Sequence, residues 1–419
     1  MTCPGSPGRF RWIICALLFA ATTINYMDRQ VLGILAAPLQ RDLRWSEAEY
    51  GYIVTAFSAA YAIGQVAVGW LIDRLGTRAG YALALGVWSL AAAAHGAARS
   101  ALQFGIARFA LGLGEAGNFP AAVKTVTEWF PKRERALAVG LFNCGSNVGA
   151  IVTPLAVPWI ALTWGWPWAF YSTGAIGLLW IALWLPLYRR PEEHPRLSRA
   201  ELDHIRSDAE AAQPGVRWRR LLAFRATWAL VAARFLTDPV WWFYLYWVPK
   251  FLHTSYGLTL DRIGPPLIAI YLAADFGSIF GGWLSSTMIR RGVPVSRARK
   301  LAILACALMV TPIALIPRVS EVWVAVALVG MAAAGHQGWA ANLFAMISDL
   351  YPARAVSSAA GITGFGGSVG GMLAATATGL VLQYTGTYWP LFLWAAGAYL
   401  TILAIIHAAI PRIEPLRME

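Results

Sequence analysis

The chain has 419 residues, of which 58% are hydrophobic and only 13% are charged, and its formal net charge is +13. Soluble domains carry about a quarter charged residues, so this composition excludes an ordinary soluble protein. Strong positive charge can indicate nucleic-acid binding, but no basic patch with base-reading side chains accompanies it, and we expect no nucleic-acid partner.

Apolar stretches of roughly 20 residues, long enough to cross a bilayer as helices, recur along the whole chain. The alternating pattern of barrel strands is absent, so the sequence predicts an all-α membrane protein. Twelve transmembrane helices are expected near 10–37, 50–71, 79–97, 101–126, 135–162, 166–187, 227–252, 263–287, 299–317, 321–347, 355–382 and 388–409.

The basic residues predict the orientation of these helices. In this topology 24 of the 34 Lys and Arg lie in the N-terminus, the even-to-odd loops and the C-terminus, and five lie in the opposite loops. The positive-inside rule then places both termini in the cytoplasm. The first apolar run continues into charged residues without a small-residue cleavage site, so we expect it to be a span and not a removed signal.

The first predicted span contains adjacent charges, Asp28 and Arg29, two residues after Tyr26. A charge inside a bilayer costs at least a few kcal/mol and usually marks a substrate site or a proton relay. The second span contributes Tyr61. Phenol groups can bind a polar ligand in a cavity, but they are equally common as interfacial packing.

A charged turn follows the second span in the pattern G-x-x-x-D-R-x-G-x-R, from Gly69 to Arg78. An acid and basic residues at a helix end can form an interhelical charge cluster that closes one side of a transporter. The alternative is a plain loop whose charges orient the helices. The candidate gate residues are Gly69, Asp73, Arg74, Gly76 and Arg78.

The fourth span places Arg108 and Glu115 on one helical face, about 10.5 Å apart along the axis. That distance suits a shared polar cavity better than a direct bond. Burial favours a protonated carboxyl and a nearby arginine opposes it, so Glu115 is a candidate proton site, and Asp28 is a second one. A permanent buried ion pair is the structural alternative.

An internal repeat divides the chain into two halves. A shift of 221 residues aligns Gly114, Gly117, Gly140, Gly145 and Gly149 with Gly335, Gly338, Gly361, Gly366 and Gly370, and a shift of 213 aligns Gly69-Trp70 with Gly282-Trp283. The predicted domains are a six-helix bundle at 1–188, a cytoplasmic linker at 189–225 with a short amphipathic helix in 199–212, and a second bundle at 226–419. Parallel six-helix halves are typical of transporters with a site at the bilayer midplane. The bare glycine faces allow close helix packing, and also rocking of the halves.

The second half offers aromatic and neutral polar groups. An aromatic run follows Arg234 and Asp238 in the seventh span, where Trp242 and Tyr246 can stack on a sugar or form an interfacial belt. The tenth span supplies four further candidates for binding a polyhydroxyl ligand: His336, Gln337, Trp339 and Asn342. Whether Lys124, Arg234 and Asp238 are functional or structural stays open.

The four cysteines, Cys3, Cys15, Cys144 and Cys306, stand singly, and they predict neither a disulfide framework nor a metal site. No set of nucleophile, base and orienting residue is present, so we expect neither an enzyme nor a cofactor.

Five segments resemble the anion:cation symporter family of the major facilitator superfamily, over essentially the whole chain. They are INYMDR (24–29), RFALGLGEAGNFPAAVK (108–124), ERALAVGLFNCGSNVGA (134–150), RFLTDPVWWFYLYWVPKFL (234–252) and GHQGWAANLF (335–344). The last two segments resemble bacterial hexuronate transporters most closely, and the Gly69–Arg78 turn resembles the signature loop of the superfamily. In that turn's second-half counterpart, Gly282–Arg291, Ser286 replaces the acid.

The resemblance implies a major facilitator fold and proton-coupled uptake of an organic acid across the bacterial inner membrane. We expect a functional monomer, although the sequence does not fix the oligomeric state. It implies that Arg29 contacts the substrate carboxylate, that Asp28 and Glu115 handle protons and that Arg108 tunes Glu115. Tyr26 and Tyr61 would join the sugar site. Galactonate-type relatives look to have a glutamine where Ser146 and Asn147 stand here, which argues against galactonate.

The sequence is also compatible with two other functions. The chain could import another organic anion, such as an aldonate, a tartrate or an aromatic acid, or it could sense such a ligand without transporting it. A sensor would be supported by a long soluble signalling domain, and none is evident in the sequence.

Overall fold

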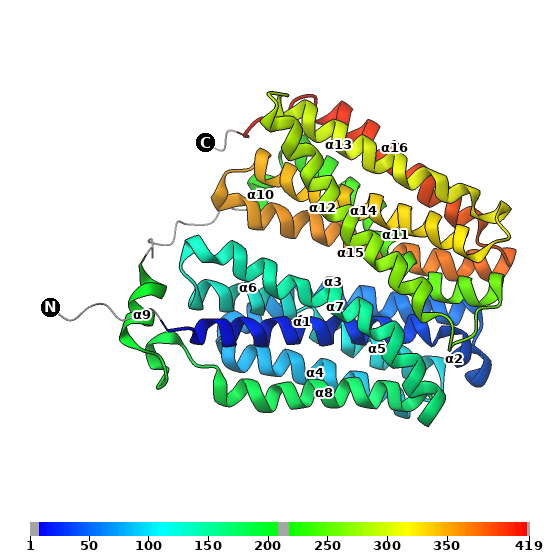
Figure 1. Cartoon of the computed structure of the whole chain (residues 1–419), viewed down its shortest axis with the longest axis horizontal. Coiled ribbons are helices and arrows are strands. Elements are labelled where there is room, and N and C mark those ends of the chain that lie inside the picture. Colours follow the sequence, from blue (N-terminus) through cyan, green and yellow to red (C-terminus); the bar gives the residue numbers. More distant parts are fainter. Residues whose placement is uncertain (1–7, 208–217, 417–419) are drawn as a thin grey trace. The chain divides into compact units, whose positions relative to one another are not determined.

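The computed structural model describes residues 8–207 and 218–416, and every regular element in these ranges is a helix (Figure 1). The helices of the first half are α1 (Phe10–Ile34), α2 (Ala36–Leu43), α3 (Glu47–Leu75), α4 (Thr77–Ala97), α5 (Ala101–Glu115), α6 (Asn118–Trp129), α7 (Lys132–Trp164) and α8 (Trp166–Leu187). The linker carries η1 (Pro191–Glu193), α9 (Arg199–Arg206) and α10 (Trp218–Leu221). The second half contains α11 (Arg225–Tyr256), α12 (Gly264–Arg290), α13 (Val295–Val310), η2 (Thr311–Arg318), α14 (Val322–Leu350), α15 (Ala353–Thr385) and α16 (Trp389–Ala409).

Each of the twelve predicted spans coincides with a helix or a pair of consecutive helices. The fourth span is divided into α5 and α6 at Ala116–Gly117, within a glycine-rich stretch that favours helix poorly. The ninth begins as α13 and ends as the 3-10 helix η2, whose Pro312 has no N–H to continue the α-helical ladder. The predicted linker helix is present as α9, and residues 208–212 of that prediction lie outside the described residues.

Eight continuous helical segments of the described residues, one of them α13 together with η2, are long and apolar enough to cross a membrane. A ninth span is formed if Glu47–Gln65 and Ala67–Leu75, which meet at 46°, are taken together. The remaining predicted spans fall short for local reasons. For example, α5 and α6 have only 15 and 12 residues because their span is broken.

The described residues form two compact units. The first comprises those in Met1–Leu32 and Ala59–Ala212, and the second comprises those in Gly33–Ser58 and Gln213–Glu419. Residues 33–58, which the sequence places in the first bundle, therefore make their contacts within the second unit. They include α2 and the first part of α3.

The internal repeat is also present in the helix packing. In the first unit, Gly145 and Gly149 of α7 face the backbone of Phe19 and Thr23 in α1. In the second, α15 meets α11 in the same way: Gly366 and Gly370 face Val231 and Phe235. At the other two predicted contact glycines, Gly140 and Gly361, none of the described residues lies within 4 Å of where a Cβ would stand, so the expected close packing is not found there.

These duplicated contacts correct the alignment of the first span. Helices α7 and α15 are related by 221 residues, as the sequence predicts, but α1 and α11 are related by 212. Asp28 therefore corresponds to Val240 and not to Pro249, which a shift of 221 would give. Arg29 corresponds to Trp241, and Glu115 still corresponds to His336.

A third duplicated contact depends on glycines of α12. A Cβ on Gly277 would overlap the backbone of Ala334 in α14, and a Cβ on Gly281 would lie 2.5 Å from the Gly338 Cα. The same arrangement recurs in the first unit, where Gly64 meets Leu113 and Ala116. Helices without a hydrophobic driving force between them associate through such small residues.

We expect Gly277→Ala to destabilise the protein by about 1–3 kcal/mol, because the added methyl forces α12 away from α14. Gly282→Ala, in the same helix but with no neighbour within 4 Å, is the matched control and should be neutral or slightly stabilising. Thermal unfolding in detergent measures both. Equal melting temperatures for the two variants would contradict the steric argument.

The linker is attached to the first unit by ion pairs. Arg11 contacts Glu134 at 2.9 Å and Glu201 at 3.2 Å, and His204 contacts Glu134 at 2.7 Å. Partial burial opposes ionisation of Glu134, but the hydrogen bonds and charges of Arg11 and His204 outweigh burial and hold its pKa below the usual value. Helix α9 is thereby connected to the first turns of α1 and α7.

A lowered pKa in the folded state means that ionised Glu134 stabilises the fold above the unfolded carboxyl's pKa of about 4.3. This stabilisation is lost as the pH falls through the lower folded pKa. We therefore expect Glu134→Gln to reduce the melting temperature at pH 7, with a difference that shrinks below about pH 4. Glu193→Gln, an exposed neighbour in the linker, is the control. A constant difference across that range would exclude the charged network as its cause.

Candidate functional site

Four ionisable side chains are buried together in the first unit. Asp28 and Arg29 of α1 are 2% and 3% exposed, and Arg108 and Glu115 of α5 are fully buried. Isolated buried charges are very costly, so such groups must balance and bind one another. Two arginines and two carboxyls give the cluster zero net charge when both acids are ionised.

The central contact is an ion pair between helices. Arg29 Nε donates to Glu115 Oε2 at 2.6 Å. The Arg29 guanidinium also lies over two aromatic rings, 5.3 Å from the Tyr26 centroid and 4.7 Å from that of Tyr61. The structure therefore brings together four residues that the sequence singled out separately, on α1, α3 and α5.

Arg108 holds the backbone of α1. Its guanidinium donates to the carbonyl oxygens of Asp28 at 3.3 Å and of Arg29 at 2.9 Å. Glu115 is thus paired with Arg29, which lies on a different helix. Arg108 lies on the same face of α5 as Glu115 but binds the backbone of α1 instead. Arg108 fixes the position of the two charged residues, and its predicted tuning of Glu115 stays a prediction.

Asp28 differs from Glu115 in its surroundings. Both carboxyl oxygens of Asp28 are buried, and neither accepts a well-aligned hydrogen bond from the described residues. The Thr173 hydroxyl of α8 is close enough for a weaker hydrogen bond to this carboxyl. A buried carboxylate with so little hydrogen bonding is costly, which keeps Asp28 a candidate proton site.

The second unit has a neutral counterpart of the ion pair. Trp241 and His336, which correspond to Arg29 and Glu115, stack with their ring centroids 5.4 Å apart at an interplanar angle of 9°. His336 Nδ1 shares a hydrogen bond of 2.6 Å with the Tyr399 hydroxyl. The repeat therefore keeps the contact between these helices and replaces the charges with aromatic rings.

The other candidates of the second half separate into two groups. Trp242 stacks on Tyr246 with centroids 5.9 Å apart, and its ring packs against Gly371 of α15. Trp339 and Asn342 are buried in the bundle, where Asn342 Nδ2 donates to the Gly281 and Gly338 carbonyls at 2.9 Å. Gln337 is half-buried and lies beside His336 in the helix. Asn342 thus contributes to the packing of α12 on α14.

Arg234 and Asp238 form an ion pair at 2.8 Å within α11. Two glycines of α15 make room for it, because a Cβ on Gly364 would contact Arg234 and one on Gly367 would overlap the Asp238 carboxylate. Under the 212-residue relation, Asp238 corresponds to Tyr26, the residue beside the Arg29 guanidinium. The pair therefore occupies the helix position that contributes to the charge cluster in the first unit.

The predicted gate residues have different individual roles. Asp73 pairs with Lys124 at 2.6 Å, Arg74 lies over the Trp70 ring, and Arg78 donates to the Leu185 carbonyl at the end of α8. Gly76 has φ of +79° at the junction of α3 and α4, a conformation that favours glycine. None of the described residues lies within 4 Å of where a Cβ on Gly69 would stand. Lys124 is the partner that the sequence did not identify, because it lies 51 residues from Asp73.

The Asp73–Lys124 contact gives a test of the gate. The Asp73 side chain is 74% exposed, so the pair should contribute no more than about 1 kcal/mol to stability. We expect Asp73→Asn and Lys124→Gln to change the transport rate equally, and the double variant to be no worse than either single one. Initial uptake rates measure this. Additive effects would show that the two residues act separately.

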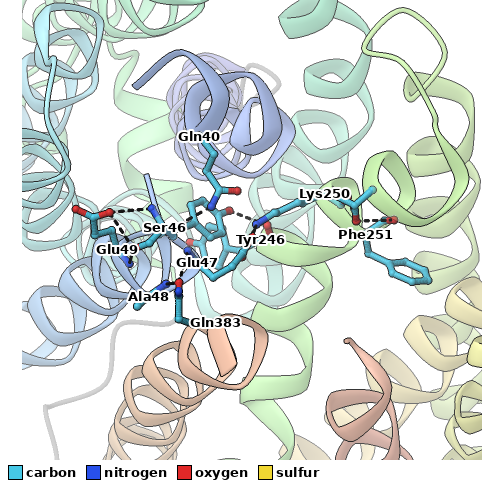
Figure 2. Close-up of polar contacts among 11 residues, drawn as sticks. Gln40, Ser46, Glu47, Ala48, Glu49, Tyr246, Lys250, Phe251 and Gln383 are labelled. Atoms are coloured by element: carbon cyan, nitrogen blue, oxygen red, sulfur yellow. Dashed lines mark hydrogen bonds and ion pairs between the residues drawn. The ribbon is translucent and has the colours of Figure 1, made fainter. Parts of the chain in front are cut away.

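A second charged contact lies in the second unit (Figure 2). Lys250 of α11, only 4% exposed in its side chain, donates to both carboxylate oxygens of Glu47 at the start of α3. The Gln383 side-chain oxygen of α15 accepts from the Glu47 and Ala48 backbone N–H groups at 3.1 and 3.5 Å. The side chain of Gln383 thus satisfies donors that the helix itself leaves free.

Further contacts extend this junction along α3. The Tyr50 hydroxyl donates to the Tyr246 carbonyl at 2.7 Å, and the Thr55 and Thr376 hydroxyls are 2.8 Å apart. Between them, Gly51 packs against Gly379, where a Cβ would lie 2.9 Å from the opposing Cα. We call the Glu47–Lys250 ion pair the latch, and these contacts the α3 junction.

Two duplicated sets of membrane-length helices, with a buried charge cluster in one of them, define a membrane transport protein. A model of the Major Facilitator Superfamily matches residues 18–344. The chain belongs to the major facilitator superfamily, and it is a transporter and not an enzyme.

Several curated relatives have sugar-acid names. The chain is 33% identical to the hexuronate transporter of Escherichia coli (strain K12) over 389 residues, 91% of this chain and 90% of that protein. It is 32% identical to the D-galactonate transporter of Escherichia coli O6:H1 over 416 residues, 96% and 95% of the two chains. It is 36% identical to the galacturonate transporter of Dickeya chrysanthemi over 279 residues, 65% and 81%. The resemblance to hexuronate transporters seen in the sequence is confirmed.

Solved structures of a bacterial homolog to the human lysosomal transporter Spinster share the fold. The unoccupied and occupied inward-facing forms give TM-scores of 0.72 and 0.73 at 18% identity, and cover 96% of this chain and 96% and 95% of theirs. At this identity the likeness shows the fold alone, and it confirms the predicted major facilitator architecture.

Proposed function

We propose that this transporter is a proton-coupled symporter that imports a hexuronate, such as glucuronate or galacturonate, by alternating access across the bacterial inner membrane. The observation that carries the proposal is the buried cluster of Asp28, Arg29, Arg108 and Glu115. The sugar-acid names of the relatives support the substrate class. The excess of basic residues in one set of loops supports cytoplasmic termini.

The charge balance of the cluster explains why proton and anion would bind together. With both acids ionised the cluster is neutral, and protonation of either one leaves a net charge of +1. A single substrate carboxylate on Arg29 then restores neutrality, so each ligand favours binding of the other. Asp28 is the first proton site in this scheme because its carboxyl is buried and, unlike that of Glu115, forms no close ion pair with an arginine side chain.

Glu115 is the second proton site, and its release from Arg29 frees the guanidinium for the substrate. Tyr26 and Tyr61 would contact the sugar next to that carboxylate. The second half would supply sugar recognition through Trp242, Tyr246, His336 and Gln337, and Trp339 and Asn342 would support them by packing. Asp238, at the helix position that corresponds to Tyr26, is an additional acceptor for sugar hydroxyls.

The test is uptake of labelled glucuronate and galacturonate into vesicles with an imposed pH gradient, with and without a protonophore. We expect accumulation that the protonophore abolishes, and competition by hexuronates that exceeds competition by galactonate or galactarate. A monovalent anion with one proton would not respond to an imposed membrane potential, whereas two protons would add about 2.3 kcal/mol per 100 mV. Binding without uptake of any of these acids would favour a sensor, and stronger competition by galactonate would overturn the hexuronate assignment.

A further inference from the structure

A groove of about 1020 Å³ lies in the second unit along α13, α16 and the C-terminal segment, far in sequence from every residue of the proposed transport site. Helices α13 and α16 lie side by side (Figure 1). The groove occupies the ends of two membrane-length segments, Val295–Arg318 and Trp389–Ala409. It therefore opens where a bilayer's hydrocarbon meets its headgroups.

The walls of the groove are held by defined hydrogen bonds. Lys300 Nζ donates to the Pro411 carbonyl at 2.7 Å and lies 3.4 Å from His407 Nδ1. The Ile413 backbone N–H donates to Ser296 Oγ at 3.1 Å, and the Ile413 side chain is buried. The segment after α16 is thus fixed against the start of α13 and closes one side of the groove.

The groove has two chemically different parts. Its rim carries Arg297, Lys300 and Arg412, together with His407, against one carboxylate, Glu414. Its floor is apolar and includes Leu301 and Leu400, which are 44% and 39% exposed. A cationic rim above an apolar floor is complementary to an amphiphile with an anionic head.

We propose that this groove binds an anionic phospholipid, with its phosphate at Arg297 and Arg412 and an acyl chain on the leucines. Clusters of basic residues at the membrane boundary attract anionic lipid headgroups, and basic pockets between transmembrane helices bind them individually. The apolar floor would bind the acyl chain of the lipid. A free phosphate or a soluble sugar acid has no such chain and would leave the floor uncovered. The bound lipid would join α13, α16 and the C-terminal segment on the cytoplasmic side of the predicted orientation.

The repeat supplies an internal comparison. The corresponding place in the first unit, where α4 begins and α8 ends, holds a smaller cavity of about 330 Å³. Arg189 and Arg190 line it together with Glu128 and Glu193. Arg78 also lines it, so three arginines face two carboxylates there, whereas Arg297, Lys300 and Arg412 face only Glu414 in the larger groove. The positive charge of the first-unit cavity is therefore more nearly balanced, and the cavity has less room for a lipid.

The experiment uses the full chain in detergent with 1-palmitoyl-2-oleoyl-phosphatidylglycerol, phosphatidylcholine with the same chains, or sn-glycerol 3-phosphate. Native mass spectrometry counts the retained lipids, and thermal unfolding measures their stabilising effect. We expect phosphatidylglycerol to be retained by the wild type, and Arg297→Gln/Arg412→Gln to weaken its apparent affinity on the order of tenfold. Arg189→Gln/Arg190→Gln removes the same charge from the comparison site and should leave retention unchanged.

Three results would overturn the proposal. Equal loss of phosphatidylglycerol in both double variants would indicate a general charge effect. Equal retention of phosphatidylcholine would remove the role of the basic rim. Full displacement by sn-glycerol 3-phosphate would show a site for small anions and not for a lipid. The four substituted arginines are all exposed, so both double variants should fold normally. Gel filtration of each variant checks this.

Discussion

Asp28→Asn is expected to abolish accumulation of substrate against a gradient and to lower the melting temperature less than Glu115→Gln does. The wild-type carboxyl oxygens accept no well-aligned hydrogen bond from the described residues, so an amide of the same shape breaks no ion pair and no strong hydrogen bond, although it leaves the cluster with a net charge of +1. It does remove the group that would exchange a proton. Gradient-driven uptake should fall to background, whereas exchange of labelled for unlabelled substrate across the membrane should persist.

Glu115→Gln is the informative comparison. It also removes a carboxyl, but it breaks the buried ion pair with Arg29, which costs about 3–5 kcal/mol. We expect a clear loss of thermal stability together with the loss of accumulation. Asp275→Asn, a substitution in a membrane-length helix of the second unit, controls for the general effect of losing an acid within a span. Normal accumulation by Asp28→Asn would contradict the proton assignment.

The sequence predicted the helices better than the contacts between them. The twelve spans follow from runs of apolar residues, which every span must have, and all twelve coincide with helices or helix pairs. The pairing of Arg29 with Glu115 was not predictable, because helical spacing reports which face a residue occupies and not which neighbouring helix meets that face. The same spacing drew attention to Arg108, whose guanidinium binds the backbone of α1 instead.

The alignment of the two repeated halves was also only partly predictable from the sequence. Glycines marked the 221-residue relation between α7 and α15, since close packing requires small residues in both halves. The first span carries no such marker, because its contacts with α7 use backbone carbonyls that any residue supplies. Only the positions of Phe19 and Thr23 against those of Val231 and Phe235 give the 212-residue relation. That relation makes Trp241 the counterpart of Arg29.

The Glu47–Lys250 latch was also invisible in the sequence, because its residues are 203 positions apart. In the structure it joins the α3 junction of the second unit, where residues 33–58 of the first half pack on α11 and α15. In the predicted topology this end of the helices is extracytoplasmic. A transporter that admits substrate from outside must open that end, so the latch is expected to oppose opening.

Glu47→Gln is expected to favour the open state, because it leaves the buried Lys250 charge without its partner at a cost of about 3–5 kcal/mol in the closed state. Glu47→Gln/Lys250→Met removes both charges and should restore much of the closed population. The reporter is Thr376→Cys, introduced at the half-buried junction in a chain whose native cysteines are replaced. A membrane-impermeant maleimide should label it at least tenfold faster with Glu47→Gln than without it.

The comparison of single and double variants separates the latch from a general loss of stability. If the junction needs only a side chain that fills the space beside Lys250, the Cys at position 376 should react at the same rate with Glu47→Gln and with the double variant. If burial of an unpaired charge is the cause, the single variant labels fast and the double variant labels slowly. Glu49→Gln, which removes an exposed carboxylate two residues away that binds Ser46 and not Lys250, should leave the labelling rate at the wild-type level. Fast labelling in that control would mean that the start of α3, and not the ion pair, holds the junction closed.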